Sequence, residues 1–430
     1  MQETQCGSDL LGCIAHHIPS SHDGQLNCAT AWRQDATYML RSLLERSSYP
    51  PNACRQYAYF ETAYLIPFCG LSPRETTGPS SYVGDDGTPI EFSWVIESED
   101  KMTVRCVIEP ISSFGTLTPS NTWMSFLLSL RNFSAHDTFD IAWAQTCFDY
   151  FAHHSPLNGN TSQHSTQFIV GADYTHNDGI VGKAYFIPHI RSQATGISSD
   201  KLVTECMKVL GLEDPWAMVI RYLATLPEHY QVKTEIVAVD CVQPSQNRAK
   251  VYVRTQASSL SSIIDLMTLG GELSDAAILS AVATVRHLWH LLFSEADESV
   301  SIPCLRPGHF SSGFVVYFEM RLNRSTPSTK TYIPVRHYCR DDAIISQAMA
   351  QYYREIGLCS VGDRYVSDIQ HLCPHRDLSA RTGVQAYIGR AARKRGSQVS
   401  VYLSPESFAP ERKLKTIPDK IENIENTRRS

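Results

Sequence analysis

The chain has 430 residues, of which 43% are hydrophobic and 19% are charged, so a disordered or fibrous protein is excluded. Its 38 Lys and Arg residues against 44 Asp and Glu residues leave a formal net charge of −6. Binding to nucleic acid through overall charge is therefore not expected. The longest apolar runs fall short of the roughly 18 residues that cross a membrane. The first twenty residues carry no signal-peptide pattern, and we expect no membrane contact.

The cysteine and histidine pattern gives no sign of a disulfide framework or a metal. There are 13 cysteines, an odd number without a CxxC spacing, which is typical of reduced thiols in a cytoplasmic protein. The histidine pairs at 16–17 and 153–154 and the Cys-Pro-His sequence at 373–375 lack zinc-site spacing. We expect a cytoplasmic protein that needs no metal and no other cofactor.

Five pairs of β-rich segments recur along the chain. Each pair is rich in Val, Ile, Tyr and Phe and is joined by a short polar or Gly-containing turn, which is the signal of a β-hairpin. The pairs are 91–97 with 102–111, 166–174 with 179–188, 235–242 with 249–255, 313–322 with 330–338, and 383–391 with 398–404. They predict ten antiparallel strands.

Two helical patterns accompany each hairpin. Apolar residues recur at the i, i+3 and i+4 spacing, and Ser, Thr or Asp often precedes the first turn. The segments are 35–47, 55–66, 122–133, 137–153, 200–211, 214–226, 259–270, 274–293, 341–357 and 363–373. The repeating unit is therefore α-α-β-β, present five times.

Ten consecutive antiparallel strands must protect their sheet edges, and closure into a barrel with the helices outside achieves this. We therefore predict an α+β fold with one barrel domain over residues 1–430, and a charged tail at about 411–430. The alternative is two separate α+β domains of about half the chain each, but no Pro-, Gly- or Ser-rich linker marks a boundary.

Strand alternation places several cations and tyrosines on shared faces, because residues i and i+2 point the same way. Lys183 shares a face with Tyr185, and Lys330 shares one with Tyr332. A third strand places Arg248, Lys250 and Tyr252 together, and Arg105 and Tyr387 lie in the corresponding hairpins. The face is either an ordinary wet sheet surface or a lumen that binds a polyanion such as a pyrophosphate.

Seven blocks of the sequence resemble signature blocks of one enzyme family, the fungal aromatic prenyltransferases of the dimethylallyltryptophan-synthase type. They occur in the family's order over residues 30–408. The blocks are DGTPIEFSW (86–94), VRCVIEPIS (104–112), KAYFIP (183–188), DCVQPSQNRAKVY (240–252), KTYIPVRHY (330–338), GVQAYIGR (383–390) and VYLSPE (401–406). The family's fold, the αββα (ABBA) barrel, matches the expected one.

The resemblance implies a metal-independent Friedel–Crafts alkylation, in which an aromatic ring attacks the allyl cation formed from a prenyl diphosphate. It assigns diphosphate binding to Arg105, Lys183, Arg248, Lys250 and Lys330, the last where several members have Gln. It also assigns four tyrosines to a shield around the cation, namely Tyr185, Tyr252, Tyr332 and Tyr387. Glu91 matches the catalytic acidic residue that accepts a hydrogen bond from an indole N–H in members that modify indoles.

Two departures from the family pattern concern the aromatic acceptor. Members that prenylate tryptophan hold its carboxylate with an Arg where this chain has Glu235, which would repel a carboxylate. Some members carry a Lys within the stretch that corresponds to Gln167–Val170 here, and this chain has none. The region where the family gates the length of the donor lies around Val315, so a longer prenyl donor stays open.

The sequence thus predicts dimethylallyl transfer to an indole ring, in a tryptophan-containing cyclic dipeptide or an indole alkaloid of secondary metabolism. One alternative is a phenolic acceptor such as tyrosine, a xanthone or a naphthalene. Another is a barrel that binds isoprenoids or alkaloids without catalysis. The expected partners are small-molecule substrates, and the protein is expected to be a monomer or a weak homodimer.

Overall fold

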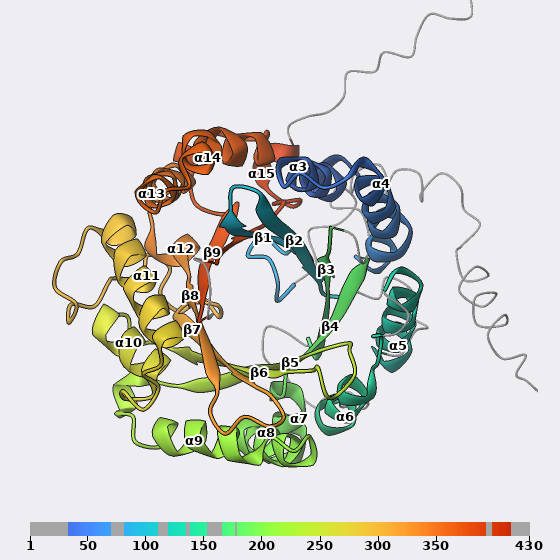
Figure 1. The fold of residues 1–430 in the computed structure, drawn as a ribbon, viewed down its shortest axis with the longest axis vertical. Coiled ribbons are helices and arrows are strands. Elements are labelled where there is room, and N and C mark those ends of the chain that lie inside the picture. Colours follow the sequence, from blue (N-terminus) through green and yellow to red (C-terminus); the bar gives the residue numbers. More distant parts are fainter. Residues whose placement is uncertain are drawn as a thin grey trace, which may run out of the picture.

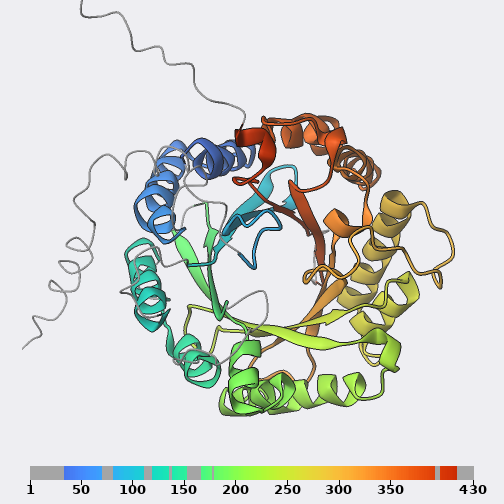
Figure 2. The same cartoon turned by 180° about the vertical axis from the view of Figure 1, so that it is seen from behind.

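The computed structural model describes residues 33–69, 81–110, 119–134, 138–152, 166–176, 179–392 and 398–413. Within them, ten strands form a barrel around a central lumen, and helices form a ring outside it (Figures 1 and 2). The histidine pairs at 16–17 and 153–154, and the charged tail from residue 414 onward, lie outside the described residues.

The strands agree with the five predicted pairs to within a few residues at each end. They are β1 (Ile90–Ser98), β2 (Lys101–Ile108), β3 (Phe168–Tyr174), β4 (Ile180–Phe186), β5 (Lys233–Asp240), β6 (Ala249–Thr255), β7 (Phe314–Met320), β8 (Ser328–Ile333), β9 (Gln385–Ala391) and β10 (Val399–Leu403).

The helices occupy the intervals between the hairpins, as predicted. They are α3 (Tyr38–Arg46), α4 (Pro51–Phe60), α5 (Pro119–Leu130), α6 (Ala142–Phe151), α7 (His189–Thr195), α8 (Ser199–Val209), α9 (Glu213–Leu223), α10 (Leu260–Thr268), α11 (Ala276–Phe293), α12 (Val335–Tyr338), α13 (Asp342–Glu355), α14 (Cys359–Leu372) and α15 (Pro410–Lys413). Short π or 3-10 turns lie at Arg33–Thr37, Glu61–Leu65, Ile66–Phe68, Arg131–Phe133, Glu228–Tyr230 and Leu378–Ala380.

All ten strands belong to one closed sheet, which confirms the predicted barrel. The order around the ring follows the sequence, and every neighbouring pair is antiparallel. The last strand, β10, returns to the first, with Phe92 opposite Leu403 and Ile96 opposite Val399. No strand edge of this sheet is left open, so the arrangement as two separate sheets does not occur.

One predicted strand is shorter than expected. The segment 330–338 leaves the sheet after Ile333, and Val335–Tyr338 forms the short helix α12 instead. Pro334 explains the change, because proline has no N–H for the ladder and its fixed φ suits the position just before a helical turn. The chain therefore leaves the strand direction at the end of β8. Arg336 consequently lies on α12 and not on an extension of the strand.

The hydrophobic core lies between the outer face of the barrel and the helices. On β6 the residues Ala249, Val251 and Val253 are fully buried in this core. The alternate residues of the same strand, Lys250 and Tyr252, line the lumen instead. The period of two thus separates an apolar outer face from a polar inner face.

Helix α11 is apolar in overall composition, although Arg286, His287 and His290 interrupt its apolar residues. By length and composition alone it could cross a membrane. It packs against α10, α13, β8 and β9. Its buried side chains are Ile278, Ala281, Val282, Val285, Leu288, Trp289 and Leu292. This apolar face covers the part of the barrel formed by β8 and β9.

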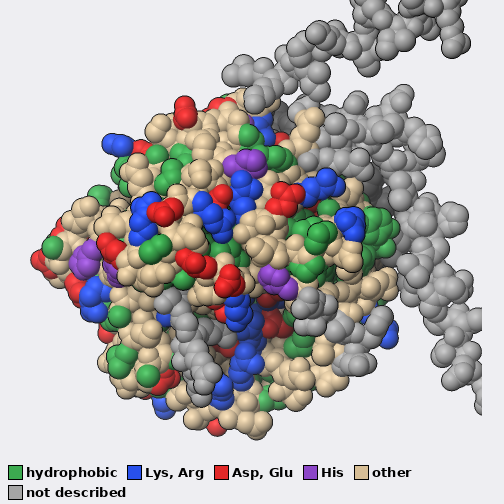
Figure 3. Space-filling model, turned by 45° about the horizontal axis from the view of Figure 1, so that its top comes forward, with side chains coloured by type: hydrophobic (Ala, Val, Ile, Leu, Met, Phe, Trp, Pro, Cys, Tyr) green, Lys and Arg blue, Asp and Glu red, His purple; other side chains and the backbone are tan. Residues whose placement is uncertain are grey.

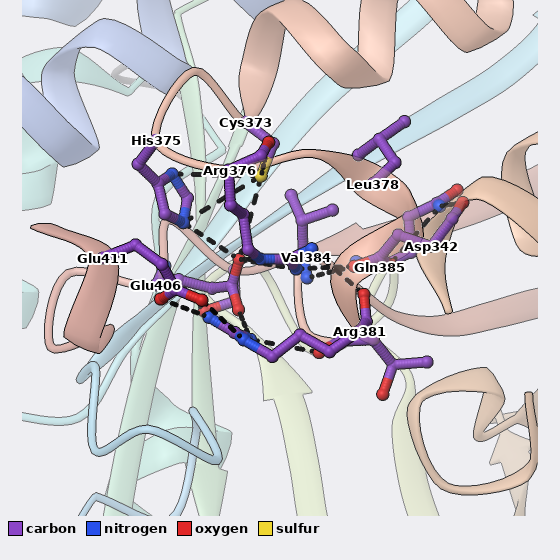
Figure 4. A network of polar contacts seen from close by, with 12 residues as sticks. Asp342, Cys373, His375, Arg376, Leu378, Arg381, Val384, Gln385, Glu406 and Glu411 are labelled. Atoms are coloured by element: carbon purple, nitrogen blue, oxygen red, sulfur yellow. Dashed lines mark hydrogen bonds and ion pairs between the residues drawn. The ribbon is translucent and has the colours of Figure 1, made fainter. Parts of the chain in front are cut away.

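A buried network of charges holds the segment after β10 against α13 and α14 (Figure 4). Arg376 contacts Asp342 at 2.7 Å and Glu406 at 2.8 Å, and all three side chains are at most 3% exposed. Arg381 also pairs with Glu406, and Asp342 accepts hydrogen bonds from the backbone N–H groups of residues 384 and 385. The network therefore ties the start of β9 to the end of β10.

The surface of the protein carries charges of both signs. Figure 3 shows Lys and Arg side chains interspersed with Asp and Glu side chains over one face. Exposed ion pairs such as Arg354 with Asp363, at 2.7 Å, belong to this surface. The mixture agrees with the small net charge of the sequence.

Candidate active site

A single cavity in the lumen contains all the residues that the sequence predicted for the site. It is lined by Glu91, Arg105, Lys183, Tyr185, Arg248, Lys250, Tyr252, Lys330, Tyr332 and Tyr387, together with Glu235 and Val315. These residues come from β1, β2, β4, β5, β6, β7, β8 and β9 and from the turn before β6. The lumen face predicted from strand alternation is therefore a common cavity.

Strand β6 shows how the cavity is organised along the barrel axis. Arg248 and Lys250 lie towards one end, Tyr252 follows, and Arg254 lies towards the other end, all lining the cavity. Two residues of a strand span roughly 7 Å, so these side chains form successive layers. We call them the cation layer, the tyrosine layer and the Glu/Arg layer. The cation layer contains Arg105, Lys183, Arg248, Lys250 and Lys330, the tyrosine layer contains Tyr185, Tyr252, Tyr317, Tyr332, Tyr387 and Tyr402, and the Glu/Arg layer contains Glu91, Glu235, Arg254 and Arg336.

The cation layer contains carboxylates as well as cations. Asp240 at the end of β5 lies 2.7 Å from Nε of Arg248 and 2.8 Å from Nζ of Lys250. Nη1 of Arg248 also lies 3.0 Å from Oε2 of Glu319. The layer therefore contains five cations and three carboxylates, which are Asp240, Glu319 and Asp173. Positive charge is in excess.

The rest of the cation layer is arranged around Asp173 and Tyr402. Asp173 on β3 pairs with Lys183 and lies 3.3 Å from Nε of Arg105. Lys330 donates to the hydroxyl oxygens of Ser400 at 3.0 Å and Tyr402 at 2.8 Å. Each cation is therefore fixed by a polar neighbour.

Burial changes the ionisation of the lysines in this layer. Burial, followed by the charge of Arg248, lowers the pKa of Lys250 to about 7, although Asp240 acts in the opposite direction. Burial also lowers the pKa of Lys183. Burial by itself would raise the pKa of Asp240, but Lys250 and Arg248 hold it below its usual range. Asp240 is therefore a stable anion, while the charge of Lys250 depends on its surroundings near neutral pH.

The tyrosine layer contains two members that the sequence analysis missed, Tyr317 and Tyr402. Tyr252 lies 5.3 Å from Tyr317 and 5.8 Å from Tyr332, measured between ring centroids. Tyr332 in turn lies 5.3 Å from Tyr402 and 6.2 Å from Tyr387. Both missed residues were detectable, since Tyr317 shares a strand face with Val315 and Tyr402 lies in one of the signature blocks.

Three tyrosines of this layer are neutral, and two of its rings face a neighbouring cation. Burial raises the pKa of Tyr185, Tyr252 and Tyr332 well above the usual value. Nζ of Lys330 lies 4.9 Å from the ring centroid of Tyr332 and 5.0 Å from that of Tyr402. The rings therefore already accommodate one cation through their π faces.

Glu91 lies in the Glu/Arg layer, beside Arg336. Burial raises the pKa of Glu91 to about 8, against the lowering effect of Arg336, and Asp85 adds to the rise. Arg336 is 4% exposed and donates to the hydroxyls of Ser311 at 3.0 Å and Tyr387 at 3.2 Å. Sequence analysis missed Arg336 because it treated its segment as a strand.

Glu235 is not an isolated negative charge, which corrects the expectation of simple repulsion. Its Oε2 accepts a hydrogen bond from Nε of Arg254 at 2.9 Å and another from the hydroxyl of Tyr82 at 3.2 Å. Arg254 also lines the cavity. Because its positive charge compensates that of Glu235, charge at this position does not by itself exclude an acceptor with a carboxylate.

Two more segments that the sequence analysis singled out, residues 167–170 and the region around Val315, also contribute to the lining of the cavity. Of the stretch Gln167–Val170, Ile169 lines the cavity, and its hydrocarbon side chain cannot take up a proton. Val315 lies at the start of β7 and packs with Tyr317 and Tyr332.

Two groups of side chains bring potential metal ligands within 4.8 Å of one another among the described residues. One is Asp85 with His309 and His337, and the other is Cys373 with His375 and Glu406. In each group the carboxylate already pairs with two arginines: Arg306 and Arg336 on Asp85, and Arg376 and Arg381 on Glu406. Those positive charges oppose the binding of a metal cation.

Comparison with known proteins identifies relatives along most of the chain. A family model described as "Tryptophan dimethylallyltransferase" matches residues 29–368. The 4-O-dimethylallyl-L-tyrosine synthase of Claviceps purpurea is 29% identical, over 87% of this chain and 88% of its own length. The 7-dimethylallyltryptophan synthase of Aspergillus fumigatus is 27% identical, over 87% of this chain and 83% of its own length.

Solved structures share the fold. The crystal structure of AnaPT from Neosartorya fischeri has a TM-score of 0.74 and 22% identity, and covers 92% of this chain and 97% of its own. The crystal structure of NotF in complex with brevianamide F and DMSPP also has a TM-score of 0.74 and 22% identity, covering 93% of this chain and 99% of its own.

Fold and relatives together define the class of protein as an aromatic prenyltransferase with an ABBA barrel. This class is enzymatic, so the alternative of a non-catalytic binding barrel is not retained. The chain belongs to the tryptophan dimethylallyltransferase family, whose model matches most of its length.

Proposed function

We propose that this enzyme transfers a dimethylallyl group from dimethylallyl diphosphate to an indole ring. The observation that carries the proposal is the order of layers in one cavity, with cations at one end, tyrosines in the middle and Glu91 towards the other end. This order matches the three parts of the reaction, which are the leaving diphosphate, the allyl cation and the aromatic acceptor.

The cation layer would bind the diphosphate and stabilise it as a leaving group. When the C–O bond of the donor breaks, both bonding electrons stay on the diphosphate oxygen, and fixed cations stabilise that charge. Arg105, Lys183, Arg248, Lys250 and Lys330 would do so. Because these side chains supply the positive charge that Mg²⁺ supplies in other enzymes, we propose that no metal or other cofactor is required.

The tyrosine layer would surround the allyl cation until the acceptor attacks it. The faces of Tyr185, Tyr252, Tyr332 and Tyr387 offer cation–π stabilisation without a nucleophile that would capture the cation. Packing of these rings also limits the water that could quench it. Tyr317 and Tyr402 extend the same layer.

Glu91 would act on the acceptor. As a carboxylate, Glu91 accepts a hydrogen bond from the indole N–H. This increases the electron density of the ring as the ring attacks the allyl carbon. The new C–C bond forms with two ring electrons, and the ring proton then passes to the released diphosphate or to water, which restores aromaticity. Arg336 favours the carboxylate form of Glu91 in its buried position.

The acceptor proposed from the sequence is a tryptophan-containing cyclic dipeptide or an indole alkaloid. The NotF complex with brevianamide F supports an acceptor of that kind in a protein of the same fold. A phenolic acceptor is the second candidate, because the Claviceps purpurea relative is named for an L-tyrosine product. The phenol O–H of a tyrosine acceptor could donate a hydrogen bond to Glu91 in the same way.

A mass-spectrometric turnover assay in EDTA tests the proposal. Purified enzyme is incubated with dimethylallyl or geranyl diphosphate and with tryptophan, tyrosine, tryptophan-containing cyclic dipeptides and a dihydroxynaphthalene. We expect an indole product that is heavier by one isoprene unit, at the same rate with and without added Mg²⁺. Product on phenols alone would overturn the indole acceptor, and turnover only with Mg²⁺ would overturn the metal-free mechanism.

A further inference from the structure

Glu235 is a buried carboxylate that the proposed chemistry does not use, although it faces the same cavity as Glu91. It is 5% exposed, and the irregular pairing between β5 and β6 falls at this residue, between Thr234 and Ile236. Such a β-bulge re-aims a side chain. Glu235 and Ile236 consequently both line the cavity.

One oxygen of Glu235 is occupied, and the other is not. Oε2 accepts from Arg254 and Tyr82. In the part of the chain that the structure describes, no hydrogen bond reaches Oε1; its ion-pair partner, Nζ of the largely exposed Lys233, is 4.0 Å away. Because no hydrogen-bond donor among the described residues occupies it, Oε1 is available to a donor from the substrate.

Hydrogen bonds to the backbone hold Arg254 in position beside Glu235. Its Nη1 donates to three backbone carbonyls, those of Ser311 at 2.7 Å, Gly313 at 3.1 Å and Ser312 at 3.2 Å. Nε is taken by Oε2 of Glu235, so Arg254 holds this carboxylate in place. Oε1 can then accept a hydrogen bond, which an ammonium group can donate and a carboxylate cannot.

The same surroundings connect Glu235 to Glu91. Ser311 accepts from Arg254 at its carbonyl and from Arg336 at its hydroxyl, and Arg336 is the cation that acts on Glu91. Arg254 follows Tyr252 by two residues on one strand face, which is roughly 7 Å. Glu91 and Glu235 line one cavity, so a single acceptor could contact both carboxylates.

We propose that Glu235 determines the acceptor by binding a protonated amine on its side chain, through Oε1. Of the acceptors proposed above, this favours an indole alkaloid or another aromatic ethylamine with a protonated amine over a neutral cyclic dipeptide. This inference rests on the proposed prenyl transfer and makes the acceptor class of that reaction more specific. Glu235 acts here as a specificity residue and takes no part in bond formation.

Isosteric acceptors test the inference in the intact enzyme. Tryptamine, tryptophol and indole-3-propionate carry an ammonium, a hydroxyl and a carboxylate on similar side chains. We expect kcat/KM for tryptamine to exceed that for tryptophol by roughly tenfold or more, the size of a charge-assisted hydrogen bond. If phenols are the substrates, tyramine, tyrosol and 4-hydroxyphenylpropionate replace the indole series.

Variants separate the role of Glu235 from a general effect on the barrel. Glu235→Gln should reduce the preference for tryptamine over tryptophol to nearly one, while turnover of tryptophol persists. Glu235→Asp should keep part of the preference because it keeps the charge. Glu228→Gln, a change at an exposed glutamate on the turn before β5, should keep all of it.

The outcomes distinguish failure of the inference from failure of the proposed function. Equal kcat/KM for tryptamine and tryptophol in the unaltered enzyme would overturn the inference, even if Glu235→Gln did not fold. Preference for a cyclic dipeptide over tryptamine would overturn it as well. If no aromatic acceptor gains a prenyl group, the proposed function itself fails.

Discussion

Lys250 and Asp240 are paired inside the barrel, with Nζ of the lysine 2.8 Å from Oδ1 of the aspartate, and both side chains are at most 8% exposed. The lysine shares the carboxylate with Arg248. Burial and the charge of Arg248 lower the pKa of Lys250 to about 7, so its charge is sensitive to pH in the range where the enzyme would work.

Donor binding should therefore weaken as the pH rises. A lysine with a lowered pKa loses its proton above about 7, and the neutral amine no longer attracts a diphosphate. We expect the Kd for dimethylallyl thiolodiphosphate to rise from pH 6.5 to pH 9, measured by calorimetry. Lys250→Arg should flatten this profile because arginine stays protonated, and a profile in the unaltered enzyme as flat as that of the variant would contradict the prediction.

Removal of two cations from β6 should abolish most of the activity. Arg248→Ala combined with Lys250→Ala leaves Asp240 and Glu319 without their partners and the leaving diphosphate without two donors. We expect kcat/KM to fall by at least roughly a thousandfold, since one such electrostatic group is worth a factor of about 10²–10³. Turnover equal to that of the unaltered enzyme would show that the diphosphate binds elsewhere.

Glu91 should contribute to the chemical step on an indole. Glu91→Gln keeps the shape but cannot become a carboxylate, so we expect single-turnover rates to fall by roughly tenfold or more, in line with general acid–base contributions. Donor binding should be retained, which calorimetry with the thiolodiphosphate would check. An unchanged single-turnover rate would remove Glu91 from the mechanism.

The pH dependence of the chemical step should depend on Arg336. Because burial raises the pKa of Glu91 to about 8 while Arg336 opposes the rise, the rate should increase with pH as the carboxylate forms. Arg336→Gln removes the opposing charge and should move this increase to higher pH, reducing the rate at pH 7 by roughly threefold to tenfold. Arg336→Lys retains a charge and should shift the profile less; a purely structural role would change the rate without shifting the profile.

The buried network of Arg376, Asp342 and Glu406 should be important for stability. Arg376→Ala leaves the buried carboxylates of Asp342 and Glu406 short of one cation, and we expect it to lower the free energy of unfolding by about 3–5 kcal/mol. Arg354→Ala breaks an exposed pair with Asp363 and should change it by less than about 1 kcal/mol. Urea unfolding measures both, and equal effects would contradict the importance of burial.

The predicted fold agrees with the structure where the signal is local. The alternation in β6 predicted the strand and the face that carries Lys250 and Tyr252. The boundary at Ile333 was predicted less well, because Pro334 ends the strand within an otherwise β-rich segment. Residues after such a break, including Arg336, could not be placed by strand periodicity.

The sequence by itself determined the hairpins and the strand faces that carry the cations and tyrosines, because a period of two residues is a property of neighbours along the chain. It also predicted closure of the barrel, because ten antiparallel strands must protect their edges. Only the tertiary structure decided which charges compensate one another, as with Glu235 and Arg254 or Asp173 and Lys183. Ion pairing and burial depend on distances between strands that are far apart in sequence, and no local pattern contains those distances.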